Sequence, residues 1–300
     1  MEKKCGIVTI VGRPNTGKST LLNTILEEKI TIVSPVPQTT RKSVRGIFTD
    51  ERGQIVFVDT PGMHITPHKL GKLMLKEIDI SLKEIDLVIH LVDTTRPAGQ
   101  EERFLVDKLK DLKMPIILGL NKIDLRPLFL DNYIKLWEET KQKKVQDMPD
   151  ELILMPLSAL KGINVDKLVE KIFMLLPTGH LLYPEDIVSD FPQKLAIADL
   201  VREKLFMSLK EEIPHSLAVY VEEMRQEKKC VYIRVIILVE RESQKIIVIG
   251  KNGSVLKNVG QQARKEIEEI LEKKVFLETY VKVKPEWRED PLILKELGYL

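Results

Sequence analysis

Cysteine is scarce in this chain of 300 residues: there are only two, Cys5 and Cys230, far apart in strand-like apolar segments. Their separation excludes the close spacing of a zinc-binding motif and the dense pattern of a small disulfide-stabilised fold. Two isolated thiols are typical of small buried side chains in a protein from a reducing compartment.

Long hydrophobic runs are also lacking. No apolar run approaches the roughly 20 residues of a membrane-spanning helix. A strand-like segment begins almost at the first residue, where a signal peptide would have its charged and apolar regions. We therefore expect a cytoplasmic location. Net charge is small as well, because 47 Lys and Arg residues balance 45 Asp and Glu residues. Any affinity for a polyanion must come from local charge patterns.

Apolar strands alternate with charged, helix-length stretches in the first part of the chain. Strands are expected at 6–11, 45–49, 54–58, 86–92, 115–120 and 152–156. This alternation is typical of βαβ units, with a mainly parallel sheet and helices on both faces. We predict a three-layer α/β domain over residues 1–180 that ends with a helix at 164–176. Ligands of such sheets bind at the carboxyl ends of the strands.

The rest of the chain predicts a linker and a second domain. Residues 181–193 contain two prolines and read as the linker. Residues 194–300 predict an α+β domain. Its expected elements are a helix at about 195–211, strands at 216–226 and 230–240, a helix at about 254–272 and a strand at 275–284.

A glycine-rich octapeptide follows the first expected strand and precedes a helix. Its two glycines, Gly12 and Gly17, have the spacing of a phosphate-binding P-loop. In such a loop the backbone N–H groups converge on the phosphates, Lys18 reaches the β- and γ-oxygens, and the Ser19 hydroxyl ligates Mg²⁺. The predicted nucleotide-binding residues here are Gly12, Arg13, Pro14, Asn15, Thr16, Gly17, Lys18, Ser19 and Thr20.

Three further motifs follow later strands. Asp59 ends the strand at 54–58, where a carboxylate supports Mg²⁺, and Gly62 can offer its N–H to the γ-phosphate. Asn121-Lys122-Ile123-Asp124 ends the strand at 115–120. The Asp124 carboxylate accepts two hydrogen bonds from guanine that adenine cannot supply. We further expect Asn121 to tie the base loop to the P-loop, Lys122 to cover the base, and a backbone N–H of the segment Ser158, Ala159 and Leu160 to meet guanine O6.

These four motifs, in this order, resemble the translation-factor class of GTPases. Their spacing and the Pro-Gln-Thr-Thr-Arg segment at 37–41 narrow the resemblance to the Era family. The resemblance implies GTP hydrolysis in a P-loop NTPase domain, with Lys18, Thr40 and Gly62 in catalytic roles. It also implies that Ser19, Asp59 and a switch threonine hold Mg²⁺. By position, we expect that threonine to be Thr40 rather than Thr39.

Met63 is a departure from better-studied GTPases, many of which have a water-positioning glutamine there. A thioether cannot orient water. Either hydrolysis is slow until a partner binds, or another group or ion assists. Asn15 resembles the asparagine with which related GTPases hold K⁺ near the phosphates, so we expect K⁺ as a further ion. His64 and His68 lie nearby and are expected to be exposed rather than catalytic.

A Gly-x-x-Gly loop at 250–253 is the motif in the second domain that indicates its function. Between Ser243 and Lys265 there are five basic residues and no acidic ones, whereas residues 181–300 hold 20 basic against 21 acidic residues. This local charge favours a groove for a single nucleic-acid strand. The predicted RNA-binding residues are Lys245, Ile249, Gly250, Lys251, Asn252, Gly253, Val255 and Lys257.

The arrangement of a helix and two strands before this loop resembles a type II KH domain, which the Era family carries at its C-terminus. By propensity the segment 245–249 reads as a strand, but the resemblance implies a short helix, which we adopt. Ile249 and Val255 would line the groove or belong to the core. Trp287 would stack on a base or pack against the last helix.

The resemblance covers essentially the whole chain. It implies a monomer that binds the 3′ end of 16S ribosomal RNA and acts in maturation of the small ribosomal subunit, with peripheral membrane association. Three alternatives remain open: an ATP-dependent P-loop enzyme, an RNA-binding module whose nucleotide is structural, and a scaffold for protein partners.

Overall fold

The computed structural model describes residues 2–34, 36, 39–63 and 68–299. Contacts divide the chain into two compact units, each of which is described by itself. The first comprises the described residues of 1–33, 40–67 and 71–190, and the second those of 34–39, 68–70 and 191–300. The predicted boundaries at 180 and 193 stay a prediction. Pro37, Gln38 and His64 lie outside the described residues.

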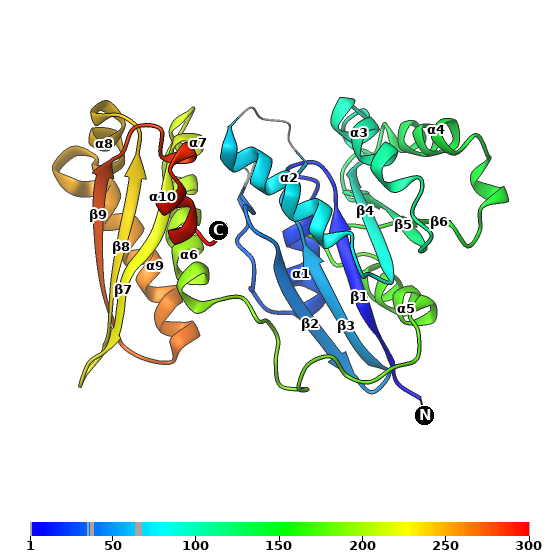
Figure 1. Cartoon of the computed structure of the whole chain (residues 1–300), viewed down its shortest axis with the longest axis horizontal. Helices are drawn as coiled ribbons and strands as arrows, with labels where there is room; N and C mark the ends of the chain where they lie inside the picture. The colour runs from blue at the N-terminus through cyan, green and yellow to red at the C-terminus, as the bar shows by residue number, and fades with distance from the viewer. Residues whose placement is uncertain (1, 35, 37–38, 64–67, 300) are drawn as a thin grey trace. The chain divides into compact units, whose positions relative to one another are not determined.

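The first unit is built on a six-stranded sheet in the order β2-β3-β1-β4-β5-β6 (Figure 1). Only β2 runs antiparallel, paired with β3 across a tight turn, and the other neighbours are parallel. The mainly parallel sheet and the hairpin are therefore confirmed. The strands are β1 (Lys4–Val11), β2 (Val44–Asp50), β3 (Gly53–Asp59), β4 (Leu87–Asp93), β5 (Ile116–Asn121) and β6 (Leu152–Pro156).

Two hydrophobic clusters cover the two faces of this sheet. One joins the sheet to α1 and α5, and the other joins it to α2, α3 and α4. The strands β3, β4 and β5 are buried along their whole length, which explains their continuous apolar sequences. The helices of this unit are α1 (Lys18–Leu26), α2 (Lys69–Ser81, whose first two residues belong to the second unit), α3 (Gln100–Leu109), α4 (Leu130–Lys141), η1 (Val145–Asp147) and α5 (Val165–Leu175).

Residues 182–190 lie along the hairpin of the first unit, held by hydrogen bonds. The Gln54 side chain accepts from the backbone N–H groups of Leu182 and Tyr183. The N–H of Ile47 donates to the carbonyl of Val188, and Arg45 pairs with Asp190 at 3.2 Å. Residues 182–190 are thus hydrogen-bonded to β2 and β3 and do not form a free segment after α5.

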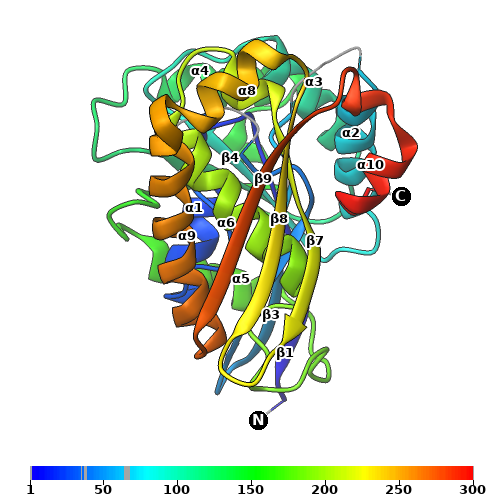
Figure 2. The same cartoon turned by 90° about the vertical axis from the view of Figure 1, so that its left-hand side faces the viewer.

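The second unit contains a three-stranded sheet in the order β7-β8-β9 (Figure 2). The strand β7 is antiparallel to β8, and β9 is parallel to β8. The segment at 245–249 is helical, as the resemblance implied, so its strand propensity is overridden. The elements are α6 (Gln193–Ser208), α7 (Ile213–Ser216), β7 (Ala218–Gln226), β8 (Val231–Val239), α8 (Glu242–Ile249), η2 (Lys251–Gly253), α9 (Ser254–Leu271), β9 (Val275–Val283), η3 (Trp287–Glu289) and α10 (Pro291–Glu296).

Trp287 belongs to the core of the second unit. Its side chain is fully buried, and its indole N–H donates to the carbonyl of Ser216 at 2.9 Å. Base stacking by Trp287 is therefore excluded, and the packing alternative holds. Both cysteines are free thiols, Cys5 buried and Cys230 half-buried. Among the described residues, no helix combines the length and apolar composition needed to cross a bilayer.

Candidate nucleotide site and RNA groove

The P-loop lies between the end of β1 and the start of α1, as predicted. Gly17 has a φ of 99°, a left-handed conformation that favours glycine. Lys18 is buried, and its ammonium group donates to the carbonyls of Gly12 and Arg13 at 3.1 and 2.9 Å. The Lys18 ammonium group is thus held against the backbone of the loop that is predicted to bind the phosphates. Burial lowers the pKa of Lys18 to about 8, although the charge of Asp59 opposes this shift.

Three predicted Mg²⁺ ligands converge beside Lys18. The Ser19 hydroxyl donates to Asp59 Oδ2 at 2.6 Å and lies 2.8 Å from the Thr40 hydroxyl. Thr40 in turn lies 3.4 Å from the same carboxylate oxygen. Thr39 instead directs its hydroxyl to the carbonyl of Val36 at 2.6 Å. The geometry therefore favours Thr40 over Thr39 as the switch threonine.

This oxygen cluster fits a hard divalent cation. Asp59 is fully buried, and its Oδ1 has no hydrogen-bond partner. An unpaired buried carboxylate oxygen beside two hydroxyls matches the all-oxygen coordination that Mg²⁺ prefers. Among the residues described, no group of three or more His, Cys, Asp or Glu side chains gathers to hold a metal.

Binding of Mg²⁺ with nucleotide should weaken as the pH falls through about 6. Burial raises the pKa of Asp59 to about 6, while the charge of Lys18 and hydrogen bonds from Ser19 and Thr40 oppose the shift. The metal requires the ionised carboxylate, so its affinity should fall about tenfold per pH unit below this value. Titrating Mg²⁺ against a fluorescent GTP analogue between pH 5 and 8 measures the effect.

Asp59→Asn is the control for this titration, because the terminal phosphate of the nucleotide also titrates near this range. A pH dependence equal in the two proteins would show that Asp59 does not carry it. The stability of the ligand-free protein should move in the opposite sense. The folded state holds the Asp59 proton more tightly than the unfolded state, so the free energy of unfolding should fall as the pH rises from about 4 to about 6.

Gly62 and Met63 lie against the P-loop. A Cβ added at Gly62 would lie 2.8 Å from both Cα and N of Pro14, so only glycine allows this approach. The N–H of Met63 donates to the carbonyl of Gly12 at 3.1 Å. The Met63 side chain is buried in the core with α3 and α4. It packs as a core residue and leaves the positioning of water to other groups.

The guanine motif meets the P-loop at Asn121. Its side-chain amide donates to the carbonyl of Thr16 at 2.7 Å, and its oxygen accepts from the N–H of Ala159 at 2.9 Å. The predicted tie between the base loop and the P-loop is therefore confirmed. Lys122 bridges the carbonyl of Asn15 and the carboxylate of Asp93 at 2.9 and 2.6 Å.

The residues that would face the base differ in exposure. Asp124 and Leu160 are exposed, and Ser158 and Ala159 are buried. The N–H of Ser158 donates to the carbonyl of Ile163 at 3.1 Å. The amides of Ser158 and Ala159 thus already have acceptors, and the contact to guanine O6 stays a prediction for this segment. Thr20 is half-buried in the first turn of α1.

The predicted RNA-binding loop joins α8 to α9. Gly250, Asn252 and Gly253 have φ values of 76°, 53° and 74°, so the loop depends on left-handed residues. A Cβ at Gly250 would also lie 2.5 Å from Cγ2 of Val255. Lys251 and Asn252 are exposed, as phosphate contacts require.

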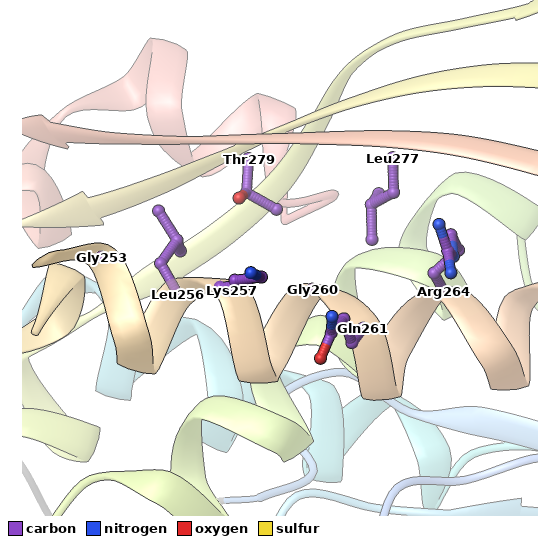
Figure 3. A pocket seen from close by; sticks show the side chains of 8 residues that line it. All are labelled: Gly253, Leu256, Lys257, Gly260, Gln261, Arg264, Leu277 and Thr279. Carbon is purple, nitrogen blue, oxygen red and sulfur yellow. The ribbon is translucent and has the colours of Figure 1, made fainter.

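A groove begins at this loop and runs between α9 and the edge strand β9 (Figure 3). Two predicted residues, Gly253 and Lys257, belong to its lining. Lys245, Ile249 and Val255 are half-buried outside it. The complete lining is Gly253, Leu256, Lys257, Gly260, Gln261, Arg264, Leu277 and Thr279.

Six of these lining residues were missed from the sequence, although a signal existed. Positions 253, 257, 260 and 264 follow the helical repeat from the loop along one side of α9. Residues Leu277 and Thr279 alternate on one face of β9. Helical spacing continued past the loop would have found the first set. Prediction of Leu277 and Thr279 would have required the strand order of the sheet, which places β9 at the edge beside α9.

Comparisons with known proteins cover both units. The family described as "50S ribosome-binding GTPase" matches residues 7–122, and the KH domain family matches residues 212–288. GTPase Era of Carboxydothermus hydrogenoformans is 45% identical over 302 residues, spanning 100% of this chain and 99% of the relative. GTPase Era of Clostridium botulinum is 46% identical over 297 residues, or 99% of this chain and 98% of the relative.

Two solved structures are similar over 99% of both chains at 41% identity. One is a variant of Aquifex aeolicus Era bound to GDP and AlF4⁻, with a TM-score of 0.88. The other is Era in complex with MgGDPNP and nucleotides 1506–1542 of 16S ribosomal RNA, with a TM-score of 0.89.

Proposed function

Because this chain belongs to the Era family of GTPases, we propose that it couples GTP hydrolysis to binding of single-stranded RNA at the 3′ end of 16S ribosomal RNA. We further propose that it acts in the cytoplasm as a monomer during maturation of the small ribosomal subunit. On the family resemblance, we also propose peripheral contact with the membrane.

The convergence of Ser19, Thr40 and Asp59 carries the catalytic part of the proposal. When bound, Mg²⁺ would neutralise charge on the β- and γ-phosphates at these three oxygen ligands. Lys18 and the P-loop amides hold the phosphates, and Gly62 offers its N–H to the γ-phosphate. Loss of that phosphate frees Thr40 and Gly62 from their ligands, which is the basis of a switch.

The groove beside α9 carries the RNA part of the proposal. Its floor and rim combine apolar Leu256 and Leu277 with basic Lys257 and Arg264. Apolar surface receives unstacked bases, and basic side chains contact the sugar–phosphate backbone. The space beside Gly260 is open, because a Cβ there would meet nothing within 4 Å.

Phosphate release in the presence of Mg²⁺ tests this function. We expect multiple turnovers of GTP, their loss on chelation of the metal, and tighter binding of an RNA fragment matching the 16S 3′ end with GDPNP than with GDP. A single turnover would favour an RNA-binding module with a structural nucleotide. Equal RNA affinity with GDPNP and with GDP would contradict the proposed coupling of GTP hydrolysis to RNA binding.

We also propose that K⁺ assists hydrolysis at Asn15, in place of the glutamine that Met63 replaces. Turnover should then be several-fold faster in KCl than in NaCl at equal ionic strength. Asn15→Ala should abolish the difference between the salts. Equal rates of the unaltered protein in K⁺ and Na⁺ would rule out this role.

A further inference from the structure

The Arg13 side chain of the P-loop is held by three residues that the nucleotide motifs do not contain: Glu102, Tyr133 and Pro97, whose carbonyl accepts from Nη2 at 3.3 Å. Its Nε forms an ion pair with the carboxylate of Glu102, whose side chain is 1% exposed. Its Nη2 donates to the Tyr133 hydroxyl at 3.2 Å. Arg13 is thereby tied to α3 and α4, two helices outside the phosphate-binding loop.

Glu102 is fixed independently of Arg13. It lies in the first turn of α3, and its Oε2 accepts from the N–H of Gly99 at 2.9 Å. Burial raises the pKa of Glu102, while the Gly99 hydrogen bond and the charge of Arg13 oppose the shift. A buried carboxylate needs such a partner, so Glu102 presents a fixed counter-charge to the P-loop.

Tyr133 continues the connection towards the guanine motif. It is fully buried, and its hydroxyl lies 2.9 Å from the carbonyls of both Asp93 and Arg96. A phenol has one proton, so it donates to one of these carbonyls at a time while accepting from Arg13. Tyr133 thus links Arg13 to the end of β4.

The connection returns to the P-loop through Lys122. The carboxylate of Asp93 accepts from Lys122, which also donates to the carbonyl of Asn15. Both residues that flank Pro14 are therefore linked to Asp93. Arg13 is linked through Tyr133 to the backbone carbonyl of Asp93, and Asn15 is linked through Lys122 to its carboxylate. We call this closed set of contacts, Arg13-Tyr133-Asp93-Lys122-Asn15 with Glu102 on Arg13, the P-loop ring.

Pro14 joins Arg13 to Asn15 and so closes the ring, and Gly62 packs against it. The place of the Gly62 amide at the γ-phosphate is therefore set by the turn at 13–15. Two of the groups that hold the base and the phosphates, Lys18 and Lys122, contact this turn only at the backbone carbonyls of Arg13 and Asn15 among other acceptors. Neither these groups nor Asp124 and the amides of 17–19 bond directly to the side chains of Glu102 or Tyr133. A change at either residue should disturb hydrolysis more than nucleotide affinity.

We propose that Glu102 and Tyr133 are positioning residues for GTP hydrolysis, which act through Arg13 to fix Pro14 and hence the approach of Gly62 to the γ-phosphate. This inference rests on the proposed role of Gly62 in hydrolysis. It assigns a function to α3 and α4 that none of the four nucleotide motifs indicates.

Two substitutions test it. Glu102→Gln keeps an oxygen for the Gly99 N–H and removes the negative charge that faces Arg13. Tyr133→Phe keeps the ring in the core and removes the hydroxyl link. Each should lower kcat about tenfold or more and leave KM and the affinity for GDP within about threefold. The double variant should lose little more than the worse single variant, because both act on one set of contacts.

Trp137→Phe is the matched control. Trp137 lies one turn after Tyr133 on α4, and its indole N–H donates to His90 in the same core at 3.1 Å, outside the P-loop ring. It should lower the melting temperature and leave kcat within about twofold of the unaltered protein.

The proposal is overturned if both Glu102→Gln and Tyr133→Phe keep kcat within twofold, or if GDP affinity falls in parallel with kcat. It is equally overturned if Trp137→Phe loses kcat to the same extent, since that would show a general loss of core stability. Absence of turnover in the unaltered protein would contradict the proposed function instead.

Discussion

Replacing Asp124 by asparagine is expected to move the nucleotide preference from guanine to xanthine. The carboxylate accepts from guanine N1–H and from the 2-amino group, whereas an amide can accept from N1–H and donate to the 2-carbonyl of xanthine. Sites that hydrogen-bond a ligand group reject analogues lacking it by roughly 10⁴-fold or more. We expect GTP affinity to fall by about 10³-fold at least. Competition of GTP, XTP and ATP against labelled GDP measures it.

The exposure of Asp124 makes this a clean test, because the substitution removes no core contact. Asp111→Asn is the matched control, since it makes the same charge change at another exposed position of the first unit. It should leave the nucleotide preference unchanged. Retained guanine selectivity in Asp124→Asn would refute the assignment and reopen the alternative of an ATP-dependent P-loop enzyme.

The double substitution Lys251→Asp and Asn252→Asp is expected to lower RNA affinity about 100-fold at moderate salt. It places negative charge where the loop approaches the sugar–phosphate backbone. Aspartate tolerates the left-handed conformation of Asn252, so the loop should keep its shape. Anisotropy of a labelled single strand, repeated at several salt concentrations, gives the affinity. The salt dependence should also weaken by about one unit of slope for each lost phosphate contact.

Lys228→Asp with Lys229→Asn is the control for charge alone. It changes the net charge by the same amount in the exposed turn between β7 and β8. That turn is a strand length, roughly 30 Å, from the Gly-x-x-Gly end of the sheet. RNA affinity should fall less than threefold there. An equal loss in the two double variants would mean that overall charge, not the loop, determines binding. No loss in either would favour the scaffold alternative.

Much of the first unit was predictable because its signals are local. Buried parallel strands are continuous apolar runs, and each nucleotide motif follows such a run, so position and chemistry agree. Thr40 was selected over Thr39 by position, and its distance to Ser19 supports that choice. The P-loop ring was not predictable, because Glu102 and Tyr133 are ordinary helix residues until the fold brings them to Arg13.

The second unit shows where local propensity gives the wrong answer. The segment at 245–249 has the composition of a strand and lies in α8, with Val248 buried and Ile246 exposed. Tertiary packing determines the conformation of this segment, and among the sequence-based arguments only the family resemblance predicted the helix. The groove lining was partly missed for a related reason. Leu277 and Thr279 reach α9 through strand order, which no short motif encodes.

The attachment of residues 182–190 to the hairpin has a mechanical consequence. A flexible chain of the 13 residues 181–193 would let its ends wander over roughly 20 Å. Only Phe191 and Pro192 separate the last residue bound to β2, Asp190, from the first residue of α6. Two residues span at most about 7 Å, and the proline ring removes one of their torsions. The free link between Asp190 and the start of α6 is therefore two residues long and has few free torsions, whereas the sequence alone predicted a flexible linker of 13 residues.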